Sequence, residues 1–218
     1  MRSNTTNTKP SRAGLSVSCV LLCVLLAAPL GCSTTTTRSG ARDNNGDPVA
    51  AYSARRQAQA LEFIRKAEAL EAQGKDDEAI LAYRQALETK NDMFAAWNNL
   101  GHLLMKQDNY ADAVSSFQVA SRLQPGDPRP EYNIGLAYQR VGWAQDSFLH
   151  FELALDRDPV YLPALRGAVR SAEMLGQADQ SVLDYIRSAQ LRETNEQWKT
   201  YFQRQRVRIE SQMSLGRD

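Results

Sequence analysis

The sequence has few of the residues that usually carry chemistry. Only two histidines occur among its 218 residues, His102 and His150, and neither stands in a spacing that would hold a metal ion. No glycine-rich phosphate loop and no Gly-x-Ser-x-Gly turn is present. The sequence therefore predicts no catalytic group, no metal site and no cofactor, and it favours a protein that is not an enzyme.

An excess of charge of one sign is also lacking. The chain has 26 Lys and Arg residues against 25 Asp and Glu residues, and no long run of one sign occurs. This balance argues against a surface for nucleic acid. A protein or peptide partner is expected rather than a nucleic acid or a small-molecule substrate.

Cysteine is scarce, and the places where it occurs are informative. Cys19 and Cys23 lie within the apolar stretch 13–30, which follows a polar segment, 1–12, with three basic residues and no acidic one. Cys32 comes directly after a glycine. This order of a basic segment, an apolar segment and a small residue before Cys resembles the signal of bacterial lipoproteins.

The resemblance implies that residues 1–31 are a signal peptide and that Cys32 receives a lipid. The protein would then be lipid-anchored in the cell envelope, at the periplasmic face of the outer membrane. An uncleaved N-terminal membrane helix is the alternative, since about 18 apolar residues are near the lower limit for spanning a bilayer. Residues 32–47, rich in Ser, Thr, Asn and Gly, are predicted to be a flexible tether.

A helical domain is predicted for residues 48–212. Asp47 and Pro48 can begin a helix as N-cap and first-turn proline. No breaker follows before Gln73, so the first helix is expected to be unusually long.

A pattern with a spacing of 34 residues dominates this domain. In its clearest copy it comprises Trp97, Leu100, Gly101, Leu104, Ala113, Phe117, Ala120 and Pro125. The next copy has Glu131 in place of Trp97 and then Ile134, Gly135, Tyr138, Ser147, Phe151, Ala154 and Pro159. The small residues suit close helix packing, and the proline ends the second helix of each copy.

This pattern resembles the tetratricopeptide repeat family. The resemblance implies an all-α, right-handed solenoid with repeats at 60–93, 94–127, 128–161 and 162–195. We expect Trp97 to be a central packing residue of the best-formed repeat. A cap helix is predicted over 195–212, with Trp198, Phe202, Gln205 and Ile209 on its inner stripe, and 213–218 would be a disordered tail.

In this family the first helix of each repeat lines a concave groove for a peptide. Carried over to this sequence, the groove positions are Asn98, Asn99, His102, Lys106, Arg129, Tyr132, Asn133, Gln139, Arg140, Arg166 and Arg170. The set is polar and leans basic, so an acidic or C-terminal peptide is the expected ligand. The alternative is that these positions form only a solvated solenoid surface.

The resemblance implies a lipid-anchored scaffold or adaptor that binds a partner while an envelope complex of the pilus or secretion type assembles. The layout is similar to that of pilotin lipoproteins. An accessory subunit that delivers substrates to an envelope hydrolase or protease is the alternative. A heat-shock-protein tail is not the expected ligand, because Ile64 and Glu68 stand where chaperone-binding members carry the first Lys and Asn of their carboxylate clamp.

Overall fold

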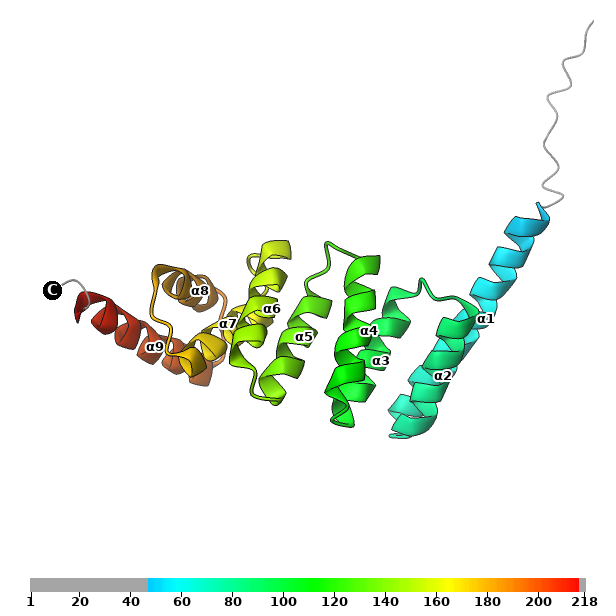
Figure 1. The fold of residues 1–218 in the computed structure, drawn as a ribbon, viewed down its shortest axis with the longest axis horizontal. Helices are drawn as coiled ribbons and strands as arrows, with labels where there is room; N and C mark the ends of the chain where they lie inside the picture. Colours follow the sequence, from blue (N-terminus) through cyan, green and yellow to red (C-terminus); the bar gives the residue numbers. More distant parts are fainter. Residues whose placement is uncertain (1–46, 216–218) are drawn as a thin grey trace, which may run out of the picture. The chain divides into compact units, whose positions relative to one another are not determined.

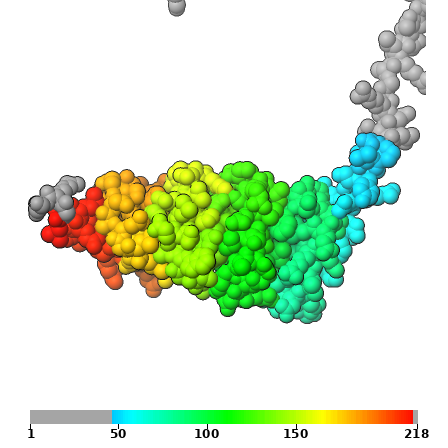
Figure 2. Space-filling model, in the orientation of Figure 1, coloured from blue at the N-terminus to red at the C-terminus, as the bar shows by residue number. Residues whose placement is uncertain are grey.

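The computed structural model describes residues 47–215, and every regular element within that range is an α-helix (Figure 1). The helices are α1 (Pro48–Ala72), α2 (Asp76–Thr89), α3 (Phe94–Lys106), α4 (Tyr110–Leu123), α5 (Arg129–Arg140), α6 (Ala144–Arg157), α7 (Leu162–Leu175), α8 (Gln180–Gln190) and α9 (Glu196–Leu215). They follow one another in a row, as a solenoid of two-helix repeats (Figure 1). Figure 2 shows the surfaces of the successive segments side by side in chain order. The predicted all-α solenoid is confirmed.

The predicted signal peptide, Cys32 and the tether up to residue 46 lie outside the described residues. Among residues 47–215, no helix combines the length and the apolar character needed to cross a bilayer.

The turns inside the repeats recur with the spacing of the sequence pattern. Gly74, Gly142 and Gly176 adopt left-handed backbone angles, with φ of 73°, 83° and 69°. Asp108 occupies the equivalent turn of the second repeat, with φ of 58°. Glycine suits this conformation because it has no Cβ, and Asp is one of the few other residues that tolerate it.

The first helix is unusually long, as the run without breakers indicates. It begins where the Asp47 carboxylate accepts a hydrogen bond of 3.0 Å from the Val49 amide, and it has 25 residues against 14 in α2. Its first half, up to residue 59, is exposed and extends past the end of α2 (Figure 1).

The last helix continues beyond its predicted end. α9 runs to Leu215 instead of residue 212, because no breaker occurs before Gly216 and Met213 still packs on the core. The start of the predicted tail, 213–215, is therefore helical. Phe202, Gln205 and Ile209 are buried, on the stripe predicted to face inward.

Close helix approaches are made where a glycine faces a phenylalanine. A Cβ placed on Gly101 would lie 2.6 Å from the Phe117 ring, and one on Gly135 would lie 2.7 Å from the Phe151 ring. Any side chain at these positions would collide with the ring, so the helices can approach this closely only at glycine. The small and aromatic positions of the sequence pattern are thus matched pairs across the helix hairpins of the second and third repeats.

Trp97 is not the central packing residue that the sequence predicts. Its side chain is only partly buried, at the edge of the core, and its indole nitrogen donates a 2.7 Å hydrogen bond to the Asn91 carbonyl. The centre of the core is instead held by the fully buried Tyr83 and Phe117. The reason is that Trp97 lies at the open edge between α2 and α4, where it lines a hollow of about 510 Å³.

The buried apolar residues form two clusters. One spans repeats one and two and ends at Ile134 on α5, and the other runs from Phe148 on α6 to Ile209 on α9. The boundary between the clusters therefore lies in the third repeat, where buried polar contacts are found.

Candidate functional site

The predicted groove residues of α3 and α5 form a polar cluster. The Asn133 amide nitrogen lies 3.2 Å from Asn98 Oδ1 and 3.1 Å from His102 Nε2. Asn98 and Asn133 are buried, whereas His102 is exposed. The face of α3, α5 and α7 that carries the eleven predicted groove positions is called the inner face below.

The electrostatics of His102 agree with this geometry. Burial of part of the ring lowers its pKa, and the positive charge of Arg129 adds a smaller lowering. The imidazole is therefore neutral at pH 7 and its Nε2 can accept the hydrogen bond from Asn133. The ring packs edge-on against Phe117 at a centroid distance of 5.3 Å, which holds it in place.

Asn99 and Asn133 occupy equivalent positions but have different partners. Asn99 donates a 3.1 Å hydrogen bond to the Tyr83 hydroxyl, which itself lies 3.4 Å from Glu71. Burial raises the pKa of Tyr83 to about 12, with Glu71 among the other causes, so the phenol stays protonated. Phe117 takes the place of Tyr83 one repeat later and offers no hydroxyl, so Asn133 turns to α3 instead.

Three of the five basic groove residues have carboxylate partners within the protein. Lys106 pairs with Asp76 at 2.6 Å, Arg129 pairs with Asp127, and Arg166 pairs with Glu193. A partner's acidic group would have to compete with these carboxylates. The inner face is therefore less available to anions than its sequence indicates.

Two basic groove residues, Arg140 and Arg170, are exposed and have no ion-pair partner among residues 47–215. Arg170 lines a hollow of about 430 Å³ with Glu173, Trp198 and Tyr201, between α7 and α9. Among residues 47–215, the inner face thus keeps two cations without an ion-pair partner, and one of them, Arg170, lies at its C-terminal end.

The remaining two predicted positions take part in packing as much as in the surface. Tyr132 is partly buried and contacts the rings of Phe151 and Tyr161, and burial raises its pKa. Gln139 lies 3.4 Å from the Ser171 hydroxyl. In the described part of the chain, no hydrogen bond connects Tyr132 or Gln139 to the cluster of Asn98, His102 and Asn133.

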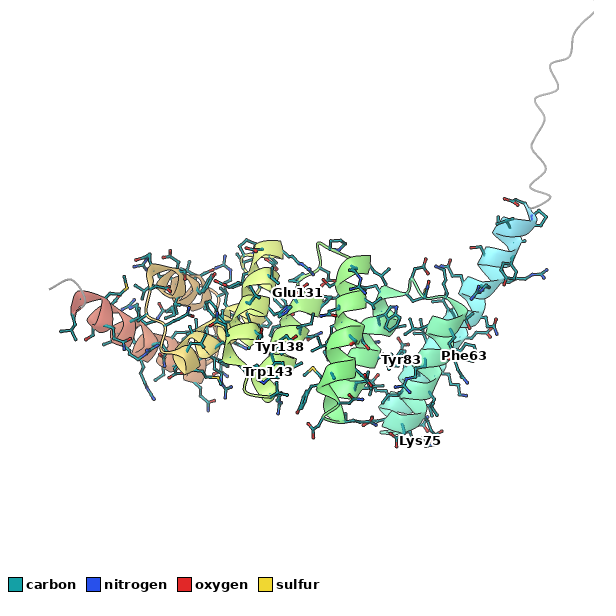
Figure 3. All side chains as sticks on the ribbon, in the orientation of Figure 1. Phe63, Lys75, Tyr83, Glu131, Tyr138 and Trp143 are labelled. Carbon is teal, nitrogen blue, oxygen red and sulfur yellow. The ribbon has the colours of Figure 1, made fainter. Side chains whose placement is uncertain are left out.

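The repeat pattern of the sequence did not reveal a second polar network, which lies between repeats two and three. Glu131, at the position of Trp97, accepts hydrogen bonds of 2.6 Å from both Ser121 and Arg157 and contacts His150 Nδ1 at 2.7 Å. Figure 3 shows Glu131 within the row of helices. Its occurrence in place of a large aromatic residue is the one signal that could have pointed to it.

Burial opposes ionisation of Glu131, but other contributions outweigh it. Hydrogen bonds from His150 and Ser121, with the charge of Arg157, hold its pKa below the ordinary value. The carboxylate is therefore ionised at pH 7 and saturated with partners. Such a group links α4, α5 and α6 and has a structural role, since both of its oxygens already have partners on these helices.

No metal centre is formed within the described range. Among residues 47–215, no three His, Cys, Asp or Glu side chains come close enough to hold a metal ion. What the inner face does present is amide groups with unused hydrogen-bonding capacity. Neither Asn98 Nδ2 nor Asn133 Oδ1 has a hydrogen-bond partner in the described residues.

Family models agree with the repeat architecture. A model described as TPR repeat matches residues 67–108, and a model described as tetratricopeptide repeat matches residues 94–127. Together these matches cover residues 67–127, which lie within the first two repeats predicted from the sequence, and they agree with the solenoid of two-helix repeats described above.

Curated relatives share the repeats over a small part of their length. Human Superkiller complex protein 3 is 25% identical over 122 residues, which are 53% of this chain and 8% of that protein. Mouse protein O-mannosyl-transferase TMTC3 is 28% identical over 90 residues, which are 41% of this chain and 10% of that protein. The chain therefore matches a tenth or less of each relative's length.

Solved structures share the fold. The first TPR domain of Spaghetti (RPAP3), bound to the HSP90 peptide SRMEEVD, aligns with a TM-score of 0.53 and 20% identity, covering 56% of this chain and 96% of that one. MamA from Desulfovibrio magneticus RS-1, from residue 41 to its end, aligns with a TM-score of 0.55 and 18% identity over 63% of this chain and 77% of that one. At these identities the similarity shows the fold alone.

Proposed function

We propose that this protein is a non-enzymatic scaffold that holds an extended segment of a partner protein on its inner face. The observation that carries the proposal is the cluster of Asn98, His102 and Asn133, which spans two neighbouring repeats. Its free amide donor and acceptor match the C=O and N–H groups of an extended peptide backbone. A surface built this way would bind a peptide mainly through its backbone.

The bound peptide of the Spaghetti domain supports this class of ligand, but the same ligand is not proposed here. Ile64, at the first clamp position, is buried, and Glu68 would repel a carboxylate. A heat-shock-protein tail would therefore lose the charged contacts on which the clamp depends. We propose that a weak preference for acidic residues in the peptide comes from Arg170, which has no carboxylate partner in the described range.

The inner face is tested with the partner recovered by pull-down from cells that express the protein. Asn133→Ala should weaken binding of that partner at least about tenfold, or roughly 1.4 kcal/mol, because it removes the residue that joins both repeats. Gln118→Ala, on the exposed part of α4, is the matched control and should leave the affinity unchanged. Equal affinity of Asn133→Ala and wild-type protein would exclude the inner face as the site.

The place of action proposed here is the cell envelope, with Cys32 as a lipid-carrying residue and assembly of an envelope complex as the task. The support for it is the sequence before the helices: a basic segment, an apolar segment, and Gly31 directly followed by Cys32. Mass spectrometry of the mature N-terminus tests it, and Cys32→Ser should abolish the acyl mass. A mature protein that begins at Met1 and carries no acyl group would contradict the anchor while leaving the peptide-binding proposal standing.

A further inference from the structure

A third hollow lies where the start of α4 meets the end of α5. It has a volume of about 320 Å³, which is within the range of small-ligand pockets. Its lining is apolar and aromatic and consists of Tyr110, Ala111, Val114, Ala137, Tyr138, Val141 and Trp143. This hollow is called the turn pocket below.

Trp143 gives the turn pocket an exposed aromatic wall. Its ring stacks on Tyr138 at a centroid distance of 5.7 Å and an angle of 17°, and the two residues lie side by side in Figure 3. The side chain is nevertheless 59% exposed. The repeat framework does not require a tryptophan here, since the equivalent positions of the other repeats hold Lys75, Asn109 and Gln177.

Tyr110 forms another wall, and the turn before it holds its hydroxyl in place. The hydroxyl donates a 2.5 Å hydrogen bond to the Asp108 carboxylate. Asp108 is the residue that replaces glycine in a left-handed turn, the only non-glycine residue with positive φ in the described range. Asp tolerates this conformation, and unlike Gly it has a carboxylate that can accept the hydrogen bond from Tyr110.

The edge of the turn pocket carries a positive charge. Arg140 lies between the lining residues Tyr138 and Val141 in the chain, is exposed, and has no carboxylate partner among residues 47–215. It is near Tyr110, whose pKa is raised mainly by the hydrogen bond to Asp108 and lowered to a smaller extent by the charge of Arg140. Close to the Tyr110 wall of an apolar hollow there is thus a cation without an ion-pair partner among residues 47–215.

We propose that the turn pocket binds a segment of a partner protein in which a large apolar side chain stands next to an acidic residue. The apolar side chain enters between Tyr110 and the stacked pair of Tyr138 and Trp143, and the carboxylate meets Arg140. Aromatic walls bury such a side chain efficiently, and Arg binds a carboxylate through two parallel hydrogen bonds. None of the lining residues is a predicted groove position, although Arg140 at the edge is one, and the proposal does not depend on the function proposed for the inner face.

A phage-displayed library of random heptapeptides tests the turn pocket with the full-length protein. Selection on wild-type protein should enrich peptides with a Leu, Ile, Phe or Trp within two positions of an Asp or Glu. Binding of the enriched peptides, remade synthetically, should weaken at least tenfold in both Trp143→Ala and Val141→Glu. Asn133→Ala, on the inner face, should bind them as wild type does.

Circular dichroism and thermal unfolding show whether each variant keeps its fold. If Trp143→Ala does not fold, the binding test is made with Val141→Glu. Arg140→Gln should reduce the affinity for acidic peptides and have no effect on their Asn and Gln counterparts. The proposal is overturned if no such motif is enriched, or if the peptides lose affinity only in Asn133→Ala. It is also overturned if ultracentrifugation shows self-association that Trp143→Ala abolishes, since a second copy of this chain would then be the occupant.

Discussion

Arg166 on α7 and Glu193 before α9 are joined by two hydrogen bonds of 2.7 Å, one from Nε and one from a terminal nitrogen. The Glu193 side chain is completely buried. The Arg166 guanidinium also lies 5.1 Å from the centre of the Trp198 ring, on α9. A residue expected to bind a ligand thus attaches the end helix to the last repeat.

Arg166→Ala should therefore destabilise the protein, because it leaves the Glu193 carboxylate buried without its counter-charge. We expect the free energy of unfolding to fall by about 3 kcal/mol, near the lower end of the range for a broken buried pair, since Arg166 is partly exposed. Urea denaturation measures this change.

Arg170→Ala is the matched control, one turn further along α7. It is exposed, and among residues 47–215 it has no ion pair, so its free energy of unfolding should stay within about 0.5 kcal/mol of the wild-type value. Equal effects of the two substitutions would show that the Glu193 pair does not hold α9.

Acid should weaken the junction between repeats two and three. The pKa of Glu131 is lower in the folded protein than its ordinary value, so its contribution to stability is present above about pH 4 and is lost as the pH falls through the folded pKa. In Glu131→Gln this loss cannot occur, although the protein should be less stable at pH 7.

Urea midpoints at about pH 7, pH 5 and pH 3 measure the effect. The wild-type protein should lose more stability than Glu131→Gln between the two lower values. Glu88→Gln, which removes an exposed carboxylate from α2, should follow the wild-type curve. Parallel curves for all three proteins would contradict a stabilising role of the ionised Glu131.

The features that sequence could predict are those with a fixed spacing. The turns at Gly74, Gly142 and Gly176 and the facing of Gly101 and Phe117 all follow from packing rules that act within one repeat. A single repeat contains both members of each such contact, so a pattern of residue types is enough to find it.

The state of the basic residues could not be predicted in this way. Lys106 and Asp76 are 30 residues apart in sequence and belong to neighbouring repeats, and Arg166 and Glu193 are 27 apart, with Glu193 in the segment that leads into α9. In the sequence, Glu131 stands out only as a mismatch at the position of Trp97. Its role is not visible there, because its three partners lie on α4 and α6. Only the assembled solenoid shows which carboxylates reach which cations.

Two aromatic residues of the second repeat should differ in their contribution to stability. Phe117 is fully buried, so Phe117→Ala should cost about 3–5 kcal/mol. Trp97 is partly buried at the open edge of the core, so Trp97→Ala should cost less than this range. Chemical denaturation of both variants gives the order, and a larger loss for Trp97→Ala would mean that the hollow beside it closes in solution.

A last prediction concerns the close contact between α3 and α4. Gly101→Ala places a methyl group 2.6 Å from the Phe117 ring, and the ring is fully buried, so it has little room to move away. Alanine is the better helix former by about 1 kcal/mol, but overpacking a core costs about 1–3 kcal/mol. We therefore expect Gly101→Ala to lower the free energy of unfolding, although propensity alone predicts a gain.

Gly126→Ala is the control for this prediction, since a Cβ there meets nothing within 4 Å. It should be neutral or stabilising by up to about 1 kcal/mol, because alanine restricts the unfolded chain. Adding Phe117→Leu to Gly101→Ala should then cost less than Phe117→Leu alone, because the smaller side chain removes the collision. Additive losses in this double-mutant cycle would show that Gly101 is not required by the Phe117 ring.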